Sequence, residues 1–267
     1  MWGAIIGDVV GSVYEFNNCR RKDFPLFDLK CRATDDSVMT LAVAEALAEA
    51  GEAGDAALAA RTIEIMQSLA KKYPSGYGIS FFAWLLEDDP KPYGSWGNGA
   101  AMRISPVGEY ARSEDEVKRL SRAVTAISHN HPEGLKGAEC VAMCIYLAKN
   151  GASKEQLFTC ARGYYPEIGS YTCEQLSKTY EFSESCQGTV PQALTCFFEG
   201  KDFEDTIRNA IFIGGDSDTI GAIAGSVAEV FFGIPQNILR DVQLYLDDDL
   251  QHRIEAADAK IKGRSKK

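Results

Sequence analysis

Several features that would assign this chain to a common class of protein are missing from its sequence. The eight cysteines include no CxxC pair and show no ligand-type spacing with the three histidines, which argues against structural zinc. No apolar stretch is as long as a membrane span, and the first apolar run lacks the basic start of a secretory signal. We therefore expect a cytoplasmic protein with reduced thiols.

An excess of positive charge is missing as well. The 267 residues include 38 acidic and 28 basic side chains, for a net charge of −10. Because such a surface repels backbone phosphates, we expect no nucleic-acid-binding surface. The one basic cluster is the C-terminal tail, which we expect to be solvated and frayed, with basic residues at 260, 262, 264, 266 and 267.

The alternation of apolar and polar residues that marks a half-buried strand is also lacking, whereas helical patterns recur along the chain. We predict an all-α fold and, since no linker divides the chain, a single domain over residues 1–267. The stretch 73–106 is predicted to be irregular. The predicted helices cover 3–16, 38–50, 55–72, 114–127, 135–149, 153–163, 173–179, a segment beginning at Pro191, 202–209, a segment ending at Phe232, and parts of 235–260.

Two of the predicted helices carry glycines four residues apart. Gly3, Gly7 and Gly11 form one stripe, and Gly221 and Gly225 form another. Since a helical glycine costs roughly 1 kcal/mol relative to alanine, close packing of two backbones is the expected compensation. We predict that the two stripes pack on each other, which would bring the end of the first helix to the start of the second.

Two acidic clusters stand directly before helices: TDDS at 34–37 and GGDSDT at 214–219. Aspartate and threonine can cap a helix N-terminus, where carboxylates also suit the dipole, but capping needs only one of them. Together the clusters offer the hard oxygens that Mg²⁺, Mn²⁺ or Ca²⁺ prefer, and two ordinary N-caps with acidic neighbours are the alternative. The candidate metal ligands are Thr34, Asp35, Asp36, Asp216, Asp218 and Thr219.

A glycine-rich segment interleaved with aromatic residues, YGSWGNGAAMR at 93–103, has the elements of a nucleotide-diphosphate site. Its glycines would let backbone N–H groups face phosphates, and its rings would stack on a base. It lacks the ending of a Walker loop, and a glycine-rich turn packed by aromatic residues is an equal alternative.

The loop SHNHPEG at 128–134 contains two of the three histidines. With no third nitrogen or sulfur ligand evident, hydrogen bonding to an anionic substrate is the favoured function, and simple exposure is the alternative. Cys186 is interpreted as a buried thiol, and Glu15, from the pattern alone, as an exposed charge at a helix end. The candidate substrate-binding residues of the two loops are Tyr93, Gly94, Ser95, Trp96, Gly97, Asn98, Gly99, Met102, His129 and His131.

These motifs, in this order, resemble the ADP-ribosylglycohydrolase family, which includes the dinitrogenase reductase-activating glycohydrolase. The resemblance covers essentially the whole chain and rests on GDVVGSVYE at 7–15, TDDS at 34–37, GSWGNGAAMR at 94–103, SHNHPEG at 128–134 and GGDSDTIGAIAG at 214–225. It implies a compact orthogonal helical bundle with two Mg²⁺ ions in a cleft, held by the two acidic clusters, with Mn²⁺ as an alternative ion.

The resemblance also implies a reaction. The enzyme would hydrolyse the bond at the anomeric carbon of the distal ribose and so release ADP-ribose from a protein side chain or small conjugate. Glu15 falls on a glutamate of the family and is our candidate acid/base, with Asp35 as the second candidate. The match at Glu15 looks closer to the branch that acts on ADP-ribosyl-serine and polymeric ADP-ribose.

Other positions leave the substrate linkage open. Residues 94–96 fall where that branch contacts the diphosphate and adenosine, although its tyrosine is here Trp96, and His129 looks like a substrate-contacting histidine. His131-Pro132 is more similar to arginine-specific relatives. Two further functions stay open, a non-catalytic ADP-ribose or nucleotide sensor and a metal-dependent phosphohydrolase.

Overall fold

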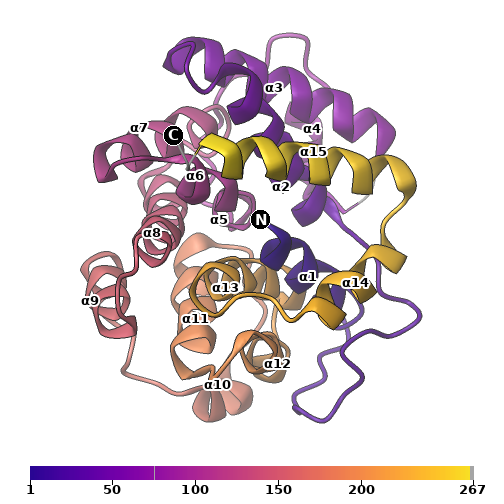
Figure 1. Cartoon of the computed structure of the whole chain (residues 1–267), viewed down its shortest axis with the longest axis vertical. Helices are drawn as coiled ribbons and strands as arrows, with labels where there is room; N and C mark the ends of the chain where they lie inside the picture. The colour runs from indigo at the N-terminus through magenta and orange to yellow at the C-terminus, as the bar shows by residue number, and fades with distance from the viewer. Residues whose placement is uncertain (75, 265–267) are drawn as a thin grey trace.

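The computed structural model describes residues 1–74 and 76–264, and in this part of the chain every regular element is a helix (Figure 1). The predicted all-α fold is confirmed. The helices are α1 (Trp2–Gly11), α2 (Asp35–Ala50), α3 (Asp55–Lys72), α4 (Ile79–Leu85), α5 (Gly99–Met102), α6 (Ser105–Tyr110), α7 (Glu114–Thr125), α8 (Pro132–Lys149), α9 (Lys154–Tyr164), α10 (Cys173–Thr179), α11 (Cys186–Glu199), α12 (Phe203–Ile213), α13 (Ser217–Phe232), α14 (Gln236–Val242), the 3-10 helix η1 (Gln243–Tyr245) and α15 (Asp248–Arg264).

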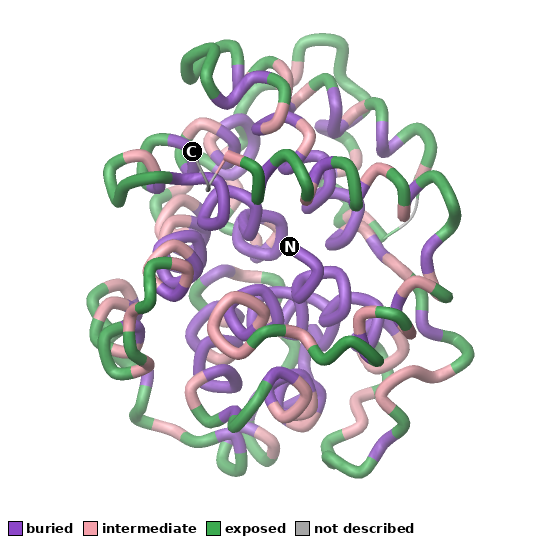
Figure 2. Tube along the Cα trace, viewed as in Figure 1, coloured by how far each residue is buried: buried purple, intermediate pink, exposed green. Residues whose placement is uncertain are grey.

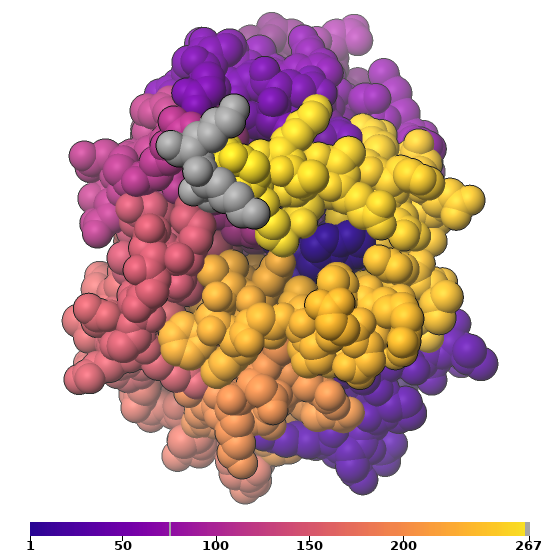
Figure 3. Space-filling model, viewed as in Figure 1, coloured from indigo at the N-terminus to yellow at the C-terminus, as the bar shows by residue number. Residues whose placement is uncertain are grey.

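The centre of the molecule is the pair α1 and α13, which are buried along most of their length (Figure 2). The predicted packing of the two glycine stripes is confirmed. A Cβ atom on Gly7 would lie closer than 3.0 Å to the backbone of Gly221, and one on Gly3 would meet the backbone of Gly225 as closely. In Figure 3 only a small indigo area of the N-terminal segment is visible beneath the yellow C-terminal helices.

Helix α1 ends at Gly11, five residues before the predicted end. The chain beyond it is tied into a turn by the Asn18 side chain. Its amide donates to the carbonyl oxygens of Tyr14 (2.7 Å) and Gly215 (2.9 Å), and its oxygen accepts from the Gly215 N–H (2.8 Å). Glu15 therefore projects from this turn, beside the start of α13, instead of from a helix.

Two other predictions of local structure were wrong. The stretch 73–106 contains the short helices α4 and α5 and the start of α6, most of whose apolar residues are buried by tertiary packing. Helix α11 begins at Cys186, five residues before Pro191, because the Ser185 side chain caps it by accepting from the Gly188 N–H (3.1 Å).

The C-terminal tail is less solvated than predicted. Lys260 is exposed, but the Arg264 guanidinium is only 8% exposed and donates to the Tyr110 carbonyl oxygen (2.7 Å) and to Glu116 (2.8 Å). Lys262 pairs with Asp258 at 2.9 Å. Acidic partners on neighbouring helices therefore hold the end of α15 in place, and residues 266 and 267 lie outside the described residues.

The cysteines match their interpretation. All eight fall within the described ranges and are unpaired, and Cys186 is fully buried. Within those ranges, no helix combines the length and hydrophobicity needed to cross a bilayer.

Candidate active site

The first acidic cluster is built on the N-terminus of α2. Thr34 caps the helix, and its hydroxyl accepts from the Asp36 N–H (3.3 Å). The buried carboxylate of Asp8 accepts from the Thr34 N–H (2.9 Å) and hydroxyl (2.7 Å), and from the Ser37 N–H (3.0 Å) and hydroxyl. Asp8 thereby fixes the turn that presents Asp35 and Asp36, a role that the sequence patterns did not indicate.

The second acidic cluster is built on the N-terminus of α13. Gly214 and Gly215 both have positive φ (73° and 80°), a conformation that glycine adopts without strain, and they turn the chain into Asp216. Oδ2 of Asp216 accepts from Nδ2 of Asn98 (2.6 Å). Asp218 follows in the first turn of the helix. The Asn98 bond ties this cluster to the glycine-rich segment.

The two clusters meet in one cleft of about 790 Å³. The Thr219 hydroxyl donates to Oδ2 of Asp36 (3.4 Å), which joins α13 to α2. One carboxylate oxygen from each of Glu15, Asp216 and Asp218 lies within 4.8 Å of the others. The cleft is lined by these predicted metal ligands: Asp35, Asp36, Asp216, Asp218 and Thr219.

Burial raises the pKa of these carboxyl groups above their ordinary values. The pKa of Asp35 rises to about 8 and that of Asp216 to about 6. The pKa values of Asp36 and Asp218 are also raised, because repulsion from neighbouring carboxylates adds to burial. Burial, with repulsion from Asp218, raises the pKa of Glu15 to about 7. Without a cation, the protein around the cluster therefore stabilises only part of the negative charge that these groups would carry if all were ionised.

This arrangement fits a divalent cation. Among the described residues, Oδ1 of Asp36 is buried without any hydrogen-bond partner, which is rare for a carboxylate oxygen. The oxygens around it are the hard ligands that Mg²⁺ and Mn²⁺ prefer. The N-terminal dipoles of α2 and α13 would repel a cation, so the carboxylates must outweigh them.

The glycine-rich segment lines the same cleft. The Gly94 N–H donates to Oδ1 of Asn130 (2.7 Å), and the Asn98 N–H donates to the Glu184 carbonyl oxygen (2.7 Å). The segment 182–185, which supplies this support and also lines the cleft, carries no motif and was missed by the sequence patterns. The predicted substrate-binding residues in the lining are Tyr93, Gly94, Ser95, Trp96, Gly97, Asn98, Gly99, Met102 and His129.

The two histidines of the loop 128–134 have different places. His129 is buried and lines the cleft. Nδ1 of His131 accepts from the Glu133 N–H (3.1 Å) and so caps α8, and the ring meets that of Trp96 edge-on at 5.4 Å. His131 thus supports Trp96 instead of lining the cleft itself.

Exposed hydrophobic side chains gather around the cleft. Phe16 is 85% exposed and Phe182 is 44% exposed, and their rings stack at 6.2 Å. Ile79, Tyr93 and Trp96 are exposed as well and line the same cleft. Large apolar side chains in contact with water at a concave site are suited to planar ligand groups. Phe16 and Phe182 were missed because neither belongs to a recognisable pattern.

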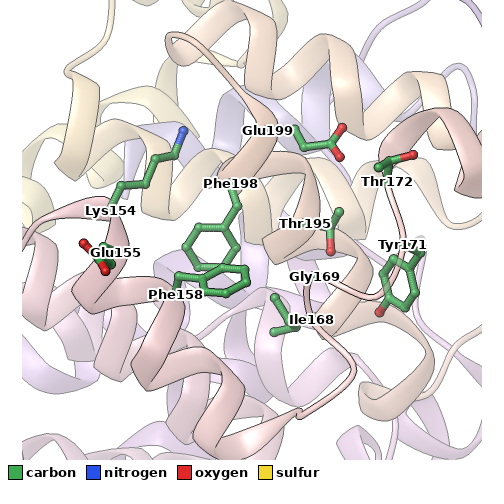
Figure 4. A pocket seen from close by; sticks show the side chains of 10 residues that line it. All are labelled: Lys154, Glu155, Phe158, Ile168, Gly169, Tyr171, Thr172, Thr195, Phe198 and Glu199. Atoms are coloured by element: carbon green, nitrogen blue, oxygen red, sulfur yellow. The ribbon is translucent and has the colours of Figure 1, made fainter.

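A second pocket, of about 430 Å³, lies between α9, α11 and the segment 168–172. Figure 4 shows Phe158 and Phe198 in its middle, with Lys154 and Glu199 toward its edges. Both charged groups have partners, since Lys154 Nζ donates to the Gly200 carbonyl oxygen (2.6 Å) and Glu199 accepts from a backbone N–H of α10 (3.1 Å). This pocket groups no catalytic side chains.

A second group of carboxylates, Glu109, Glu229 and Asp258, contains its own cations. The α-amino group of Met1 donates to Glu109 and to Glu229 (2.8 Å). Lys262 lies 2.9 Å from Asp258 and 3.5 Å from Glu229. Each of these carboxylates therefore has a cationic partner within the chain, in contrast to those of the cleft.

The fold and the cleft define an all-α protein in which two aspartate clusters face a glycine-rich loop. A sequence model of the family described as ADP-ribosylglycohydrolase matches residues 1–266, and the chain belongs to that family. It is accordingly an enzyme, a hydrolase of the glycosidase type.

The individual relatives share about a quarter of their aligned residues with this chain. The chain is 25% identical to ADP-ribosylhydrolase ARH3 of Mus musculus, over 88% of this chain and 83% of the relative. It is 24% identical to ADP-ribosylarginine hydrolase Tri1 of Pseudomonas putida (strain GB-1), over 87% of this chain and 69% of the relative. A solved structure described as an ADP-ribosylglycohydrolase-related protein complex matches with a TM-score of 0.70 and 25% identity, over 99% of this chain and 95% of that one.

Proposed function

We propose that this chain is a magnesium-dependent hydrolase that cleaves the N- or O-glycosidic bond between ADP-ribose and a protein side chain or small conjugate. One observation carries the proposal: Glu15, both acidic clusters and the glycine-rich loop line a single cleft. Family membership supports the reaction class.

Two Mg²⁺ ions, or Mn²⁺ in their place, would be held by the acidic clusters. This assignment is supported by Oδ1 of Asp36, which has no hydrogen-bond partner among the described residues. When bound, such ions orient the ribose hydroxyls and a water molecule and neutralise the surrounding carboxylates. Because the Thr34 hydroxyl already donates to Asp8, Thr34 is the proposed ligand whose side chain is least free to turn toward a metal ion. The proposed ligands are Thr34, Asp35, Asp36, Asp216, Asp218 and Thr219.

Glu15 is the proposed acid/base. It is half-buried, and in the metal-free protein burial and repulsion from Asp218 raise its pKa to about 7. Its carboxyl form can donate a proton to the departing atom, and its carboxylate form can take one from water. The neighbouring carboxylates would stabilise the positive charge that develops on the ribose ring. Asp35 is the second candidate, but a role as metal ligand would keep it ionised.

The glycine-rich loop is the proposed site of the ADP moiety. Backbone N–H groups of the loop and the ring of His129 would contact the diphosphate. The exposed rings of Tyr93 and Trp96 would stack on the adenine. His131 is proposed to act on the substrate through Trp96, which its ring supports.

We also propose that the protein works in the cytoplasm, as one domain over residues 1–267. Eight unpaired cysteines suit a reducing compartment, and a family match over residues 1–266 suits one domain.

The experiment is to offer ADP-ribosyl-serine, ADP-ribosyl-arginine, ADP-ribosylated nucleobases and O-acetyl-ADP-ribose in parallel, with Mg²⁺ or with chelator. Release of free ADP-ribose that needs Mg²⁺ is the expected result, and the conjugate hydrolysed fastest identifies the linkage. Binding of ADP-ribose without turnover would indicate a sensor, and release of inorganic phosphate from nucleotides would indicate a phosphohydrolase. Either result would overturn the proposal.

A further inference from the structure

The charge of the cleft poses a problem for the proposed substrate. A diphosphate carries two negative charges, yet the lining contains Glu15, Glu184 and four aspartates and, among the described residues, no lysine or arginine. Backbone N–H groups offset only part of this repulsion. A positive charge near the glycine-rich loop, set back from the lining, would offset more of it.

Arg103 provides such a charge. It follows α5 directly, and its side chain is buried, with 1% of the residue exposed. Its guanidinium lies 5.0 Å from the centre of the Phe81 ring. Within the described part of the chain, Arg103 forms no ion pair, and its Nε and Nη1 atoms have no hydrogen-bond partner. Burial lowers the pKa of Arg103 to about 10, so the group is still charged at neutral pH.

Burying a charge without an acidic partner costs several kcal/mol or more, so packing alone does not explain why an arginine occupies this position. Hydrophobic side chains of similar volume would fill the same space with less desolvation. The cost is accounted for if the charge acts on something that enters the cleft.

The polar contacts of Arg103 lead to His129. Nη2 of Arg103 lies 3.3 Å from Nδ1 of His129 and 3.0 Å from the Ser128 hydroxyl, which itself lies 2.9 Å from Nδ1. A guanidinium only donates hydrogen bonds, so Nδ1 must be the acceptor. The imidazole is then neutral, with its proton on Nε2.

Nε2 of His129 lies against the glycine-rich loop. A Cβ atom on Gly97 would be 3.4 Å from Nε2, and one on Gly99 would be 3.3 Å from it. The Nε2–H group is therefore directed to the segment whose N–H groups are proposed to hold the diphosphate. A larger residue at either glycine would crowd this donor.

We propose that Arg103 is a positioning residue for the diphosphate: through Nδ1 of His129 it holds the ring neutral with Nε2–H directed at the glycine-rich loop, and its buried charge offsets that of the phosphates. This inference rests on the proposed function, because it assumes an ADP moiety in the cleft.

The other titratable groups near this pair do not determine which ring nitrogen of His129 carries the proton. Tyr93 meets the His129 ring at 6.0 Å, and burial raises the pKa of its hydroxyl. Burial likewise raises the pKa of Cys186 to about 12. Both are neutral at physiological pH, and Asp35, on α2, acts on Arg103 only by attraction at a distance. Burial, together with repulsion from Arg103, lowers the pKa of His129 well below its ordinary value.

The test combines calorimetry with NMR of the His129 ring in the wild type, Arg103→Met and Arg103→Lys. In the wild type, we expect a neutral His129 ring with its proton on Nε2 between pH 5 and 8. In Arg103→Met, burial still keeps the ring neutral, but we expect the proton to be shared between Nδ1 and Nε2. The affinity for ADP-ribose should fall about tenfold or more, as for loss of a charged hydrogen bond. Adenosine, which lacks phosphates, should bind equally to both. Arg103→Lys keeps the charge and should recover part of the affinity and the Nε2–H tautomer.

Two outcomes would overturn the inference: wild-type affinity for ADP-ribose in Arg103→Met, or an equal loss for adenosine, which would indicate a collapsed pocket. If Arg103→Met does not fold, Arg103→Lys decides, because an Nδ1–H tautomer with unchanged affinity for ADP-ribose in that variant would also overturn the inference. Arg264→Met is the matched control, since that arginine packs 3.7 Å from the Tyr110 ring and away from the cleft. A wild type that binds no ADP-ribose would refute the proposed function, whereas the tautomer of His129 can be measured without ligand and still tests the role of Arg103.

Discussion

At the scale of single residues, Asp36 is a carboxyl group whose ionised form both burial and the surrounding carboxylates disfavour. Burial raises the pKa of this carboxyl group, and repulsion from Asp218, Asp8, Asp35 and Asp216 adds to the effect in that order. Since one of its oxygens has no partner among the described residues, Asp36 destabilises the metal-free fold. The same carboxylate is therefore the side chain that gains most from a cation.

Asp36→Asn should change stability and activity in opposite directions. The amide removes a group whose ionised form the metal-free fold disfavours, so the melting temperature in chelator should rise. The gain in melting temperature on adding Mg²⁺ should shrink or vanish, and ADP-ribose release should fall at least about 100-fold, because metal ions contribute several kcal/mol to such reactions. Thermal unfolding and initial rates measure both. Asp23→Asn, at an exposed aspartate, is the control and should change neither.

Glu15→Ala should lower the rate without removing the metal. General acid–base catalysis contributes about 10²–10⁴-fold, so kcat should fall within this range. Asp36 and Asp218 remain in the variant, and calorimetric titration with Mg²⁺ should still show binding. Full activity of Glu15→Ala in its metal-bound form would show that another group transfers the proton.

At the scale of elements, the contact between α1 and α13 sets the geometry of the site. One turn after Gly7, Gly11 faces the backbone of Asp218 so closely that a Cβ atom on Gly11 would lie within 3.0 Å of it. The two helices therefore approach at backbone distance at the point where Asp218 enters the cleft. Any side chain in this contact would move Asp218 relative to Glu15 and to α2.

Gly7→Ala tests this contact. Alanine is the better helix former, so an isolated helix would be stabilised, but overpacking against Gly221 should lower the free energy of unfolding by about 1–3 kcal/mol. Gly163→Ala is the matched control, because Gly163 is a helical glycine where an added Cβ atom would meet nothing within 4 Å, and it should gain about 0.5–1 kcal/mol. Urea denaturation measures both. Equal effects of the two substitutions would contradict close packing.

The elements that the sequence predicts are those whose signals are local. The amphipathic pattern over 55–72 predicts α3 with the bounds observed, and the glycine stripes predict the α1–α13 contact. Helices α4, α5 and α6 were missed because their few residues become helical through tertiary packing. The acidic clusters were found because helix starts mark them. The roles of Asp8 and of the segment 182–185 were missed, since both depend on long-range contacts.

At the scale of the whole molecule, the α1–α13 core brings together carboxyl groups that repel one another when ionised. The folded protein brings Glu15 and the aspartates of both clusters into one cleft, whereas the unfolded chain disperses them in water. Stability and metal binding are therefore linked through protons, and both depend on pH. The prediction that residues 1–267 act as one domain stays a prediction. If it is right, the protein should unfold in one cooperative transition.

Without metal, stability should fall as pH rises from about 5 to 8. The ordinary pKa of aspartate is 3.8, and folding raises it to about 6 in Asp216 and to about 8 in Asp35. Between the unfolded and folded values, the folded state binds more protons than the unfolded state, so the free energy of unfolding decreases with increasing pH. Mg²⁺ binds the ionised carboxylates, so its stabilising effect should grow over the same range. Melting temperatures at each pH, in chelator and in Mg²⁺, test this. A Mg²⁺ effect that is independent of pH, or a metal-free protein that becomes more stable toward pH 8, would mean that these carboxylates are not where the ion binds.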